Sequence, residues 1–162
     1  MKQKTLEKIL RRFQRLPLHG IDSSIILEAF DEKSKFRESC KNYLNKIGYN
    51  SRGILPISVV GEVFVIIETD MVDKTEKEIF FQFFDSLVKK RKIGFSVPKK
   101  TTFQTAEKVK ELENRIGTTD VLNLSIAVDK GVNVFVTLDE DMLHNKQLEK
   151  EFGIEIKAPY EF

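Results

Sequence analysis

The chain has few of the side chains on which zinc, heme and disulfide sites depend. Its 162 residues include one cysteine, Cys40, and two histidines, His19 and His144. A single cysteine excludes an internal disulfide, which fits a reducing, cytoplasmic setting. Two histidines are too few for a histidine-rich zinc site. One could serve a Ser-His-Asp triad, but the chain has no Gly-x-Ser-x-Gly turn to present the serine.

A strong net charge and long apolar runs are also missing. The chain has 27 Lys and Arg against 25 Asp and Glu, a formal charge of +2, so the overall charge does not indicate a nucleic-acid partner. No apolar run is long enough to span a membrane, and the basic N-terminus lacks the apolar core of a signal peptide. Since 41% of the residues are hydrophobic, we expect a single domain with a real core.

Apolar segments that suit strands alternate with amphipathic segments that suit helices. We expect strands in 18–22, 94–98, 132–138 and 154–159, a loop in 51–56, and helices in 23–30, 33–48, 58–68, 75–92, 101–117, 118–131 and 139–153. This alternation is typical of an α/β protein in which a parallel sheet is covered by helices on both faces.

Particular residues mark the ends and inner faces of these helices. Ser58 and Thr118 are the expected N-caps of their helices. The inner face of helix 101–117 is expected to carry Phe103, Ala106, Val109, Leu112 and Ile116, and phenylalanines 80, 83 and 84 are expected in the core. Residues 1–16 are expected to form a basic amphipathic helix, separable from a domain in 17–162.

Three acids follow the expected strands or begin a helix. Asp22 follows the first strand, Asp139 follows strand 132–138 with Asp141 behind it, and Asp120 lies in the first turn of helix 118–131. Ligands of open parallel sheets bind at the carboxyl ends of the strands. Helix capping explains any one of these acids alone, because carboxylates are favoured at helix N-termini.

A fourth acid, Glu62, lies within the apolar stretch "ISVVGEVFVII". A glutamate is rarely buried without a partner, and no basic residue lies near it in sequence. It could also mark the polar edge of a mostly buried helix. Gly61 beside it costs a helix about 1 kcal/mol relative to alanine. A close approach by another chain segment or a ligand would explain so small a residue there.

Four carboxylates that converge would repel one another and need a cation. All-oxygen ligands suit a hard divalent ion, magnesium or manganese, better than zinc. Metal-assisted phosphodiester cleavage is the chemistry expected of such a site, because the ion activates a water and stabilises charge on the phosphate.

The segments that carry these acids resemble a PIN-domain ribonuclease over roughly residue 17 to the C-terminus. They are "GIDSSIILEAF", "SVVGEVFVII", "TTDVLNLSIAVDKG" and "VFVTLDEDM", in the order and spacing of the family. Asp22-Ser23 matches the strand that ends in Asp and a hydroxyl residue. Thr137, Asp139 and Asp141 match the Thr-x-Asp-x-Asp motif, with Met142 in place of the usual aromatic.

The resemblance implies a three-layer α/β/α sandwich with a mostly parallel sheet of about five strands. It also implies an Mg²⁺- or Mn²⁺-dependent endoribonuclease acting on RNA. The implied metal ligands are Asp22, Glu62, Asp120 and Asp139, with Asp141 as a fifth acid. Ser23 and Thr137 would orient ligands or contact the phosphate. Many members are toxins with an antitoxin partner, others process RNA, and family habit favours a homodimer.

Two other functions compete with the nuclease. A catalytically idle PIN-like domain could act as a binding or scaffold module, although a scaffold has no need to keep four repelling carboxylates. A phosphoacceptor receiver domain also binds magnesium, and "IKAP" resembles its Lys-Pro turn. Its first strand ends in paired acids, however, and here Asp22 stands alone. Basic residues at 89–92 and 99–100 could contact phosphates, but charge runs usually face solvent.

Overall fold

The computed structural model describes residue 11 and residues 13–70 and 73–162. Of the helix expected in 1–16, residues 1–10 and 12 therefore lie outside the described residues. Within the described part, no helix is long and apolar enough to cross a membrane.

Five strands form one parallel sheet in the order β3-β2-β1-β4-β5. The strands are β1 (Leu18–Ile21), β2 (Arg52–Pro56), β3 (Ile93–Ser96), β4 (Val134–Val136) and β5 (Glu155–Lys157). Consecutive strands extend the sheet outward from β1 through β2 to β3, and β4 then pairs with the other side of β1. The direction of winding thus reverses between β1 and β4, which is where ligands bind in open α/β sheets.

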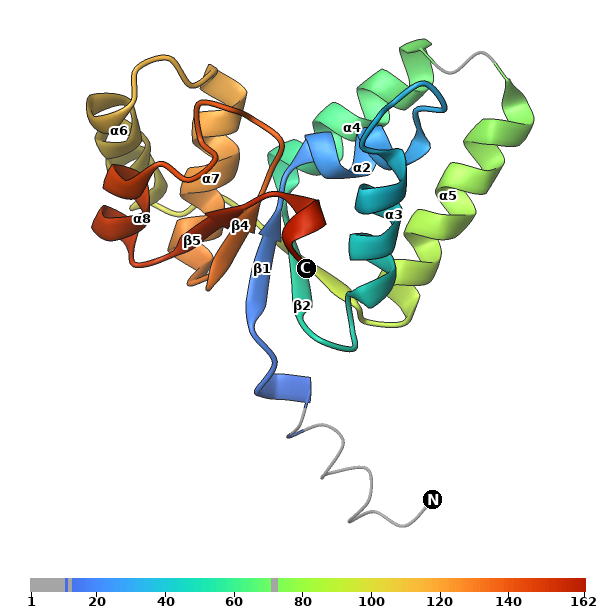
Figure 1. Cartoon of the computed structure of the whole chain (residues 1–162), viewed down its shortest axis with the longest axis horizontal. Helices are drawn as coiled ribbons and strands as arrows, with labels where there is room; N and C mark the ends of the chain where they lie inside the picture. Colours follow the sequence, from blue (N-terminus) through green and yellow to red (C-terminus); the bar gives the residue numbers. More distant parts are fainter. Residues whose placement is uncertain (1–10, 12, 71–72) are drawn as a thin grey trace.

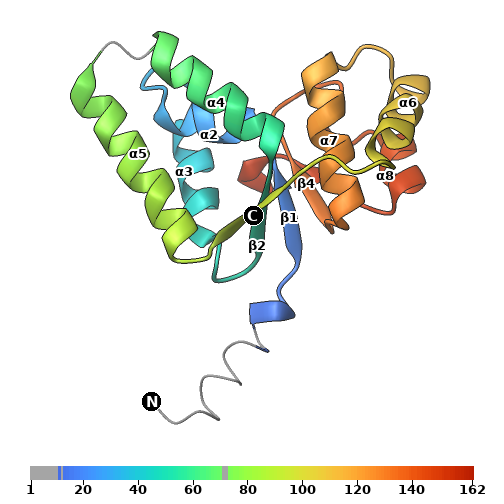
Figure 2. The same ribbon diagram turned by 180° about the vertical axis from the view of Figure 1, so that it is seen from behind.

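Helices cover both faces of this sheet, as Figures 1 and 2 show from opposite sides. They are α2 (Ser23–Phe30), α3 (Arg37–Lys46), α4 (Ile57–Asp70), α5 (Lys74–Lys89), α6 (Thr102–Leu112), α7 (Thr118–Lys130) and α8 (Lys146–Phe152), followed by the short 3-10 helix Pro159–Glu161. Helices α2 to α5 lie on one side of the sheet and α6 to α8 on the other. The expected three-layer α/β/α fold is confirmed.

Alternating strand residues divide the core into two halves. Leu55 and Val136 pack with α2 to α5, whereas their neighbours Ile54 and Phe135 pack with α6 to α8. Successive side chains of a strand point to opposite faces, so short and fully apolar strands can bury both. The sheet is therefore enclosed on both sides, and its carboxyl edge is the end at which polar groups gather.

The loop expected in 51–56 is wrong, because these residues form β2 in the middle of the sheet. Gly53 and Pro56 are residue types typical of loops, so the sequence pattern does not indicate a strand here. The structure explains the glycine: a Cβ at Gly53 would lie 2.7 Å from the Ile93 side chain and 2.9 Å from that of Ile21. A glycine in a strand often marks such a close approach, and Pro56 stands at the end of β2.

The helix expected in 139–153 is also wrong over its first half, where the chain forms turns before α8. The Asp139 Oδ1 atom accepts the N–H groups of Asp141 (2.7 Å) and Met142 (3.3 Å), so a turn closes at once. His144 has a φ of 56°, which breaks helical geometry, and Asn145 then caps α8 with its side chain.

The two expected N-caps are each displaced by one or more positions. Helix α4 already begins at Ile57, so Ser58 lies inside it and donates to Asn123 Oδ1 at 2.5 Å. Helix α7 begins at Thr118, and Gly117 is its N-cap. The consequence for the site is that Gly117, without a side chain, precedes the turn that carries Asp120.

Phe103 does not point inward as expected. It is 70% exposed in the first turn of α6, whereas Val109 and Ile116 are buried. Phe80 is fully buried in α5, and its ring lies 5.0 Å from that of Phe30 and 6.3 Å from that of Phe64. Phenylalanines from α2, α4 and α5 thus form a continuous aromatic part of the core.

We predict that Phe80→Ala lowers the free energy of unfolding by about 3–5 kcal/mol, because it leaves a cavity among packed rings. The measurement is urea denaturation followed by circular dichroism. Phe103→Ala makes the same chemical change at an exposed site and should stay within about 0.5 kcal/mol of the unsubstituted protein. Equal losses from the two substitutions would contradict this account of the core.

Candidate functional site

A pocket of about 450 Å³ lies at the carboxyl edge of the sheet, beside the point where the winding reverses. Six acids line it, among them the four predicted ones, which come from four separate segments: Asp22, Glu62, Asp120 and Asp139. Asp22 follows β1 and Asp139 follows β4, while Glu62 and Asp120 come from α4 and α7. Leu27, Glu28, Phe36, Leu138 and Glu140 complete the wall with Ser23 and Ser24.

Asp22 is the most buried of these acids, at 2% exposure. Its Oδ2 accepts the hydroxyls of Thr137 (2.8 Å) and Ser24 (2.9 Å), and its Oδ1 accepts the amide of Asn123 at 3.3 Å. Burial raises the pKa of Asp22, these hydroxyl bonds lower it in part, and the charge of Glu62 raises it further. The carboxylate is thus fixed in orientation but costly to ionise.

The Asp120 carboxylate bends back toward the start of its own helix. Its Oδ2 atom lies 2.7 Å from where a Cβ would stand on Gly117, so only a glycine leaves room for this rotamer. Burial, together with the charges of Asp22, Asp139 and Glu62, raises the pKa of Asp120 to about 6. The Asp120 carboxylate is therefore close enough to the other three to be repelled by them.

Glu62 is partly buried on α4, and its Oε2 atom is buried without a hydrogen-bond partner among the described residues. An unpaired buried carboxylate oxygen is costly, and a ligand is one explanation for it. The expectation for Gly61 is not met within this chain: a Cβ there would meet no atom within 4 Å, and the residue is exposed. Gly61 lies on the side of α4 that faces away from the protein, whereas its neighbours Glu62 and Val63 face toward it.

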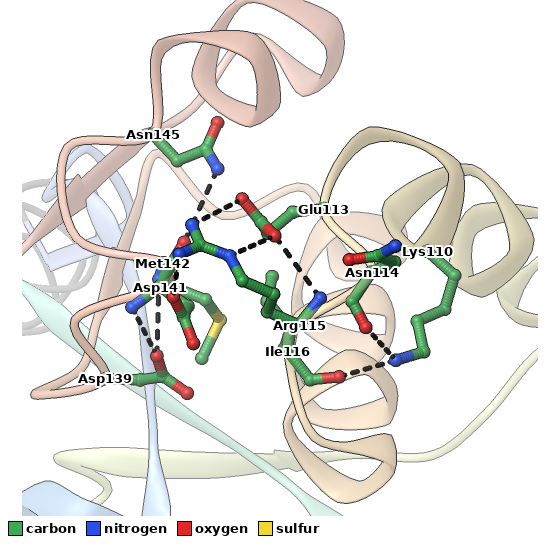
Figure 3. Close-up of polar contacts among 9 residues, drawn as sticks. All are labelled: Lys110, Glu113, Asn114, Arg115, Ile116, Asp139, Asp141, Met142 and Asn145. Carbon is green, nitrogen blue, oxygen red and sulfur yellow. Dashed lines mark hydrogen bonds and ion pairs between the residues drawn. The ribbon is translucent and has the colours of Figure 1, made fainter.

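Asp139 and Asp141 have different surroundings (Figure 3). Asp139 lines the pocket and uses Oδ1 to close the turn after β4. Asp141 is not among the residues that line the pocket; its Oδ1 lies 3.2 Å from Arg115 Nη1. The structure thus places the expected fifth acid in an ion pair beside the site.

The expected hydroxyl residues take unequal places. Thr137 is fully buried, donates to Asp22 and accepts the Asp139 N–H at 3.0 Å, so it links two of the acids. Ser23 lines the pocket, but the neighbouring Ser24 donates to Asp22. Sequence reasoning missed Ser24 and Asn123. Asn123 is fully buried one turn after Asp120, and an amide within an apolar helical face is the signal that could have identified it.

The donor set fits a hard divalent ion in chemistry. It consists of carboxylate oxygens, it includes the unpaired oxygen of Glu62, and burial together with the neighbouring carboxylates raises the Asp120 pKa. Across residues 11, 13–70 and 73–162, no three acidic, histidine or cysteine side chains are grouped closely enough to ligate one ion as they stand. Ligation therefore needs side-chain rotation or bridging waters, which magnesium commonly retains.

The basic run 89–92 lies at the opposite end of the sheet from the acids. It joins the end of α5 to the start of β3. Because all five strands are parallel, their starts lie opposite the carboxyl edge. Lys99 donates to the Asp129 carbonyl oxygen at 2.7 Å, which ties the start of α6 to α7.

Comparison with known proteins places these observations in a family. The PIN domain profile matches residues 21–148, which span all four acids. None of the curated proteins compared with the chain is significantly similar to it in sequence.

Two solved structures share the fold at low sequence identity. One is VapBC2 from Rickettsia felis bound to a DNA fragment from its promoter: TM-score 0.58, 16% identity, covering 87% of this chain and 98% of that one. The other is FitAB bound to an IR36 DNA fragment: TM-score 0.60, 11% identity, covering 88% and 95%.

We predict that Gly117→Ala weakens Mn²⁺ binding about tenfold while the metal-free melting temperature stays within about 2 °C. The new methyl group displaces only the end of the Asp120 side chain, and a φ of −59° suits alanine. Isothermal titration calorimetry and thermal melts measure the two effects. Gly94→Ala is the matched control, because it adds the same methyl in β3 at an ordinary contact distance of 3.4 Å from the Ile54 side chain. Equal affinities in both variants would contradict the proposed position of Asp120.

We predict that Asp120→Asn raises the melting temperature of the metal-free protein at pH 7 but not at pH 4. The folded pKa of about 6 exceeds the ordinary aspartate value of 3.8, so the folded state holds this proton more tightly than the unfolded state. The wild type therefore loses stability as the pH rises from about 4 to about 6, and the variant is spared this loss. Since Asp120 is partly exposed, solvent screening limits the difference to about 1 kcal/mol, or about 2–4 °C.

The stability of Asp120→Asn is compared with that of the wild type in a series of thermal melts in EDTA between pH 4 and pH 7. Asp85→Asn removes an exposed carboxylate of α5 that is paired with Lys89, and it serves as the control. A wild type and an Asp120→Asn variant that differ by the same amount at every pH would contradict the coupling among the four acids.

Proposed function

Because the chain belongs to the PIN domain family, we propose that it is an Mg²⁺- or Mn²⁺-dependent endoribonuclease. The observation that carries the proposal is the convergence of Asp22, Glu62, Asp120 and Asp139 on one pocket at the carboxyl edge of the sheet. An unpaired buried oxygen on Glu62 and a raised Asp120 pKa add support, because both are relieved by a cation.

The four acids would hold the metal, directly or through water. When bound, the ion supplies an activated water and charge stabilisation at the phosphate. Asp22 is the fixed member of the set, since Thr137, Ser24 and Asn123 restrain both of its oxygens. Among the described residues, no side chain donates a hydrogen bond to Glu62 or Asp120, so both carboxylates can rotate toward an ion. Resemblance to PIN-domain ribonucleases implies that hydrolysis leaves a 5′-phosphate and a 3′-hydroxyl.

An idle scaffold is the competing function, and the cost of the pocket weighs against it. A binding module could replace Asp120 or Glu62 by neutral residues and lose only repulsion. Retention of all four acids, with Gly117 making room for one of them, is easier to explain by selection for metal binding.

We further propose a protein partner of antitoxin type. A cleft of about 490 Å³ adjoins the site, since Leu27 and Glu28 line both pockets. Its other lining residues are Phe30, Asp31, Glu32, Lys33, Ile66, Ile67, Asp70 and Glu76, so it is acidic with an apolar floor. A basic amphipathic segment of the partner suits such a groove. Because the groove adjoins the catalytic pocket, the same segment would also cover that pocket.

A second copy of the chain is the partner proposed for the open face of α4. Ile57, Gly61 and Val65 recur at a spacing of four residues, and all three are exposed. Phe95, in register with Leu55 at the sheet edge, and Val97 are exposed as well. Apolar side chains around an open glycine permit close packing of another chain. We place the resulting homodimer in the cytoplasm, where the free thiol of Cys40 stays reduced.

Loss of an acid should abolish metal binding and cleavage together. We predict that Asp22→Asn and Asp139→Asn each weaken Mn²⁺ binding at least tenfold and lower the rate of RNA cleavage at least a hundredfold. Calorimetry comes first because it needs no RNA target; cleavage is then measured on a mixed-sequence RNA in MnCl₂ and in EDTA. Asp85→Asn is the control. A wild type that binds neither Mn²⁺ nor Mg²⁺ would rule out the nuclease and favour the scaffold.

The proposed dimer predicts that Val65→Glu converts a particle of twice 18.8 kDa into one of 18.8 kDa, because a buried charge opposes association. Light scattering after size exclusion measures the mass. Ile79→Glu changes another exposed apolar residue, on α5, and should leave the dimer intact. A wild type that is monomeric at a protein concentration of about 100 µM would refute this interface.

A further inference from the structure

Arg115 joins two loops that each lead to a pocket acid (Figure 3). It lies in the connection between α6 and α7, and its Nε and Nη2 atoms donate to the Glu113 carboxylate at 2.9 and 3.0 Å. Its Nη1 atom reaches Asp141 Oδ1 at 3.2 Å. The guanidinium therefore bridges the α6–α7 connection and the loop after β4.

Each end of this bridge is itself held in place. Lys110 donates to the carbonyl oxygens of Asn114 (2.8 Å) and Ile116 (2.7 Å), and Ile116 is buried. The α6–α7 connection is therefore fixed by α6 and by the core. On the other loop, the Asp141 N–H donates to Asp139 Oδ1, and the Asn145 amide donates to the Asp141 carbonyl oxygen at 3.4 Å. A shift of Asp141 would therefore be transmitted to Asp139.

We propose that Arg115 is a positioning residue that sets the spacing between Asp139 and Asp120, and that Asp141 is its anchor rather than a metal ligand. This inference rests on the proposed metal site. Arg115 is three residues from Thr118, the first residue of α7, and the bridge fixes the start of that helix relative to the turn of Asp139. The two acids would otherwise move independently under their mutual repulsion.

Neither a stabilising nor a phosphate-binding role accounts for the bridge as well. The Arg115 side chain is 67% exposed, and exposed ion pairs contribute only about 0–1 kcal/mol to stability. Two carboxylates, those of Glu113 and Asp141, already neutralise the guanidinium, so it offers little net attraction to a phosphate. The remaining explanation of the bridge is geometric, because the planar guanidinium forms a fork of donors that contacts both loops at once.

The sign of the effect on metal affinity separates position from charge. Removal of a cation near the site would by itself tighten Mn²⁺ binding, because repulsion is lost. If Asp141 were a metal ligand, its release from Arg115 would also tighten binding. A positioning role predicts the opposite, and it predicts a loss even in Arg115→Lys, which keeps the charge but cannot form the fork.

The test measures Mn²⁺ binding by calorimetry for the full chain and for Arg115→Lys, Arg115→Gln, Asp141→Asn and the double variant Arg115→Gln/Asp141→Asn. We expect each single variant to bind about tenfold more weakly, and the double variant to bind no more weakly than either single one. Lys89→Gln removes one charge of an exposed pair on α5 and is the control, with wild-type affinity. Unchanged or tighter binding in Arg115→Lys and Arg115→Gln would overturn the proposal.

A metal-free readout keeps this inference separate from the proposed function. In ¹⁵N spectra recorded in EDTA, Arg115→Lys should shift the amide resonances of Asp120, Asp141 and Met142, whereas Lys89→Gln should not. If the wild type binds no Mn²⁺ but these resonances move, the bridge stands and the metal site falls. If the wild type binds Mn²⁺ and the Asp120 resonance stays in place, the bridge falls and the metal site stands.

Discussion

Repulsion among four carboxylates is the constraint around which the rest of this structure is arranged. Asp22, Glu62, Asp120 and Asp139 face one pocket, where burial and the charges of the other three raise the pKa of Asp120, and burial and the charge of Glu62 raise that of Asp22. Each acid stands on a different element, so repulsion acts to separate the elements. The fold must therefore hold β1, β4, α4 and α7 together by other means.

Two apolar cores provide that restraint. The aromatic core beneath α2 to α5 fixes α4, whose buried Val59, Val63 and Ile67 turn Glu62 toward the pocket. The second core buries Leu124 of α7 and Phe135 of β4, so Asp120 and Asp139 are carried by one packed unit. Because apolar packing is insensitive to the state of the acids, the site can remain strained without unfolding the domain.

The sequence predicted the acids better than it predicted the segments between them. Asp22 and Asp139 could be identified because parallel strands bring their carboxyl ends to one edge, and Glu62 because of its apolar neighbours. Strand β2 escaped detection because Gly53 and Pro56 resemble loop residues, although one allows close strand packing and the other ends the strand. Local pattern also gave no warning that the side chain of Asp139 would close a turn instead of starting a helix.

The residues that sequence reasoning missed have partners far away in the chain. Asn123 lies within a predicted helix, yet its side chain donates to Asp22 after β1 and accepts the hydroxyl of Ser58 from α4. Such a role depends on tertiary contact and has no periodicity of its own. The only sign of it in the local sequence is an amide side chain within an otherwise apolar helical face, and the structure shows that this amide is buried.

The hydrogen bonds to Asp22 show why a polar network, rather than a single cap, surrounds the central acid. Three donors from three elements reach one carboxylate, and Thr137 also accepts the N–H of Asp139. Donors lower the cost of ionising Asp22, but burial still raises its pKa, so they do not neutralise the site. They restrict orientation while leaving the charge unbalanced. The proposed cation would balance this charge, and it explains the four acids more economically than a separate structural role for each.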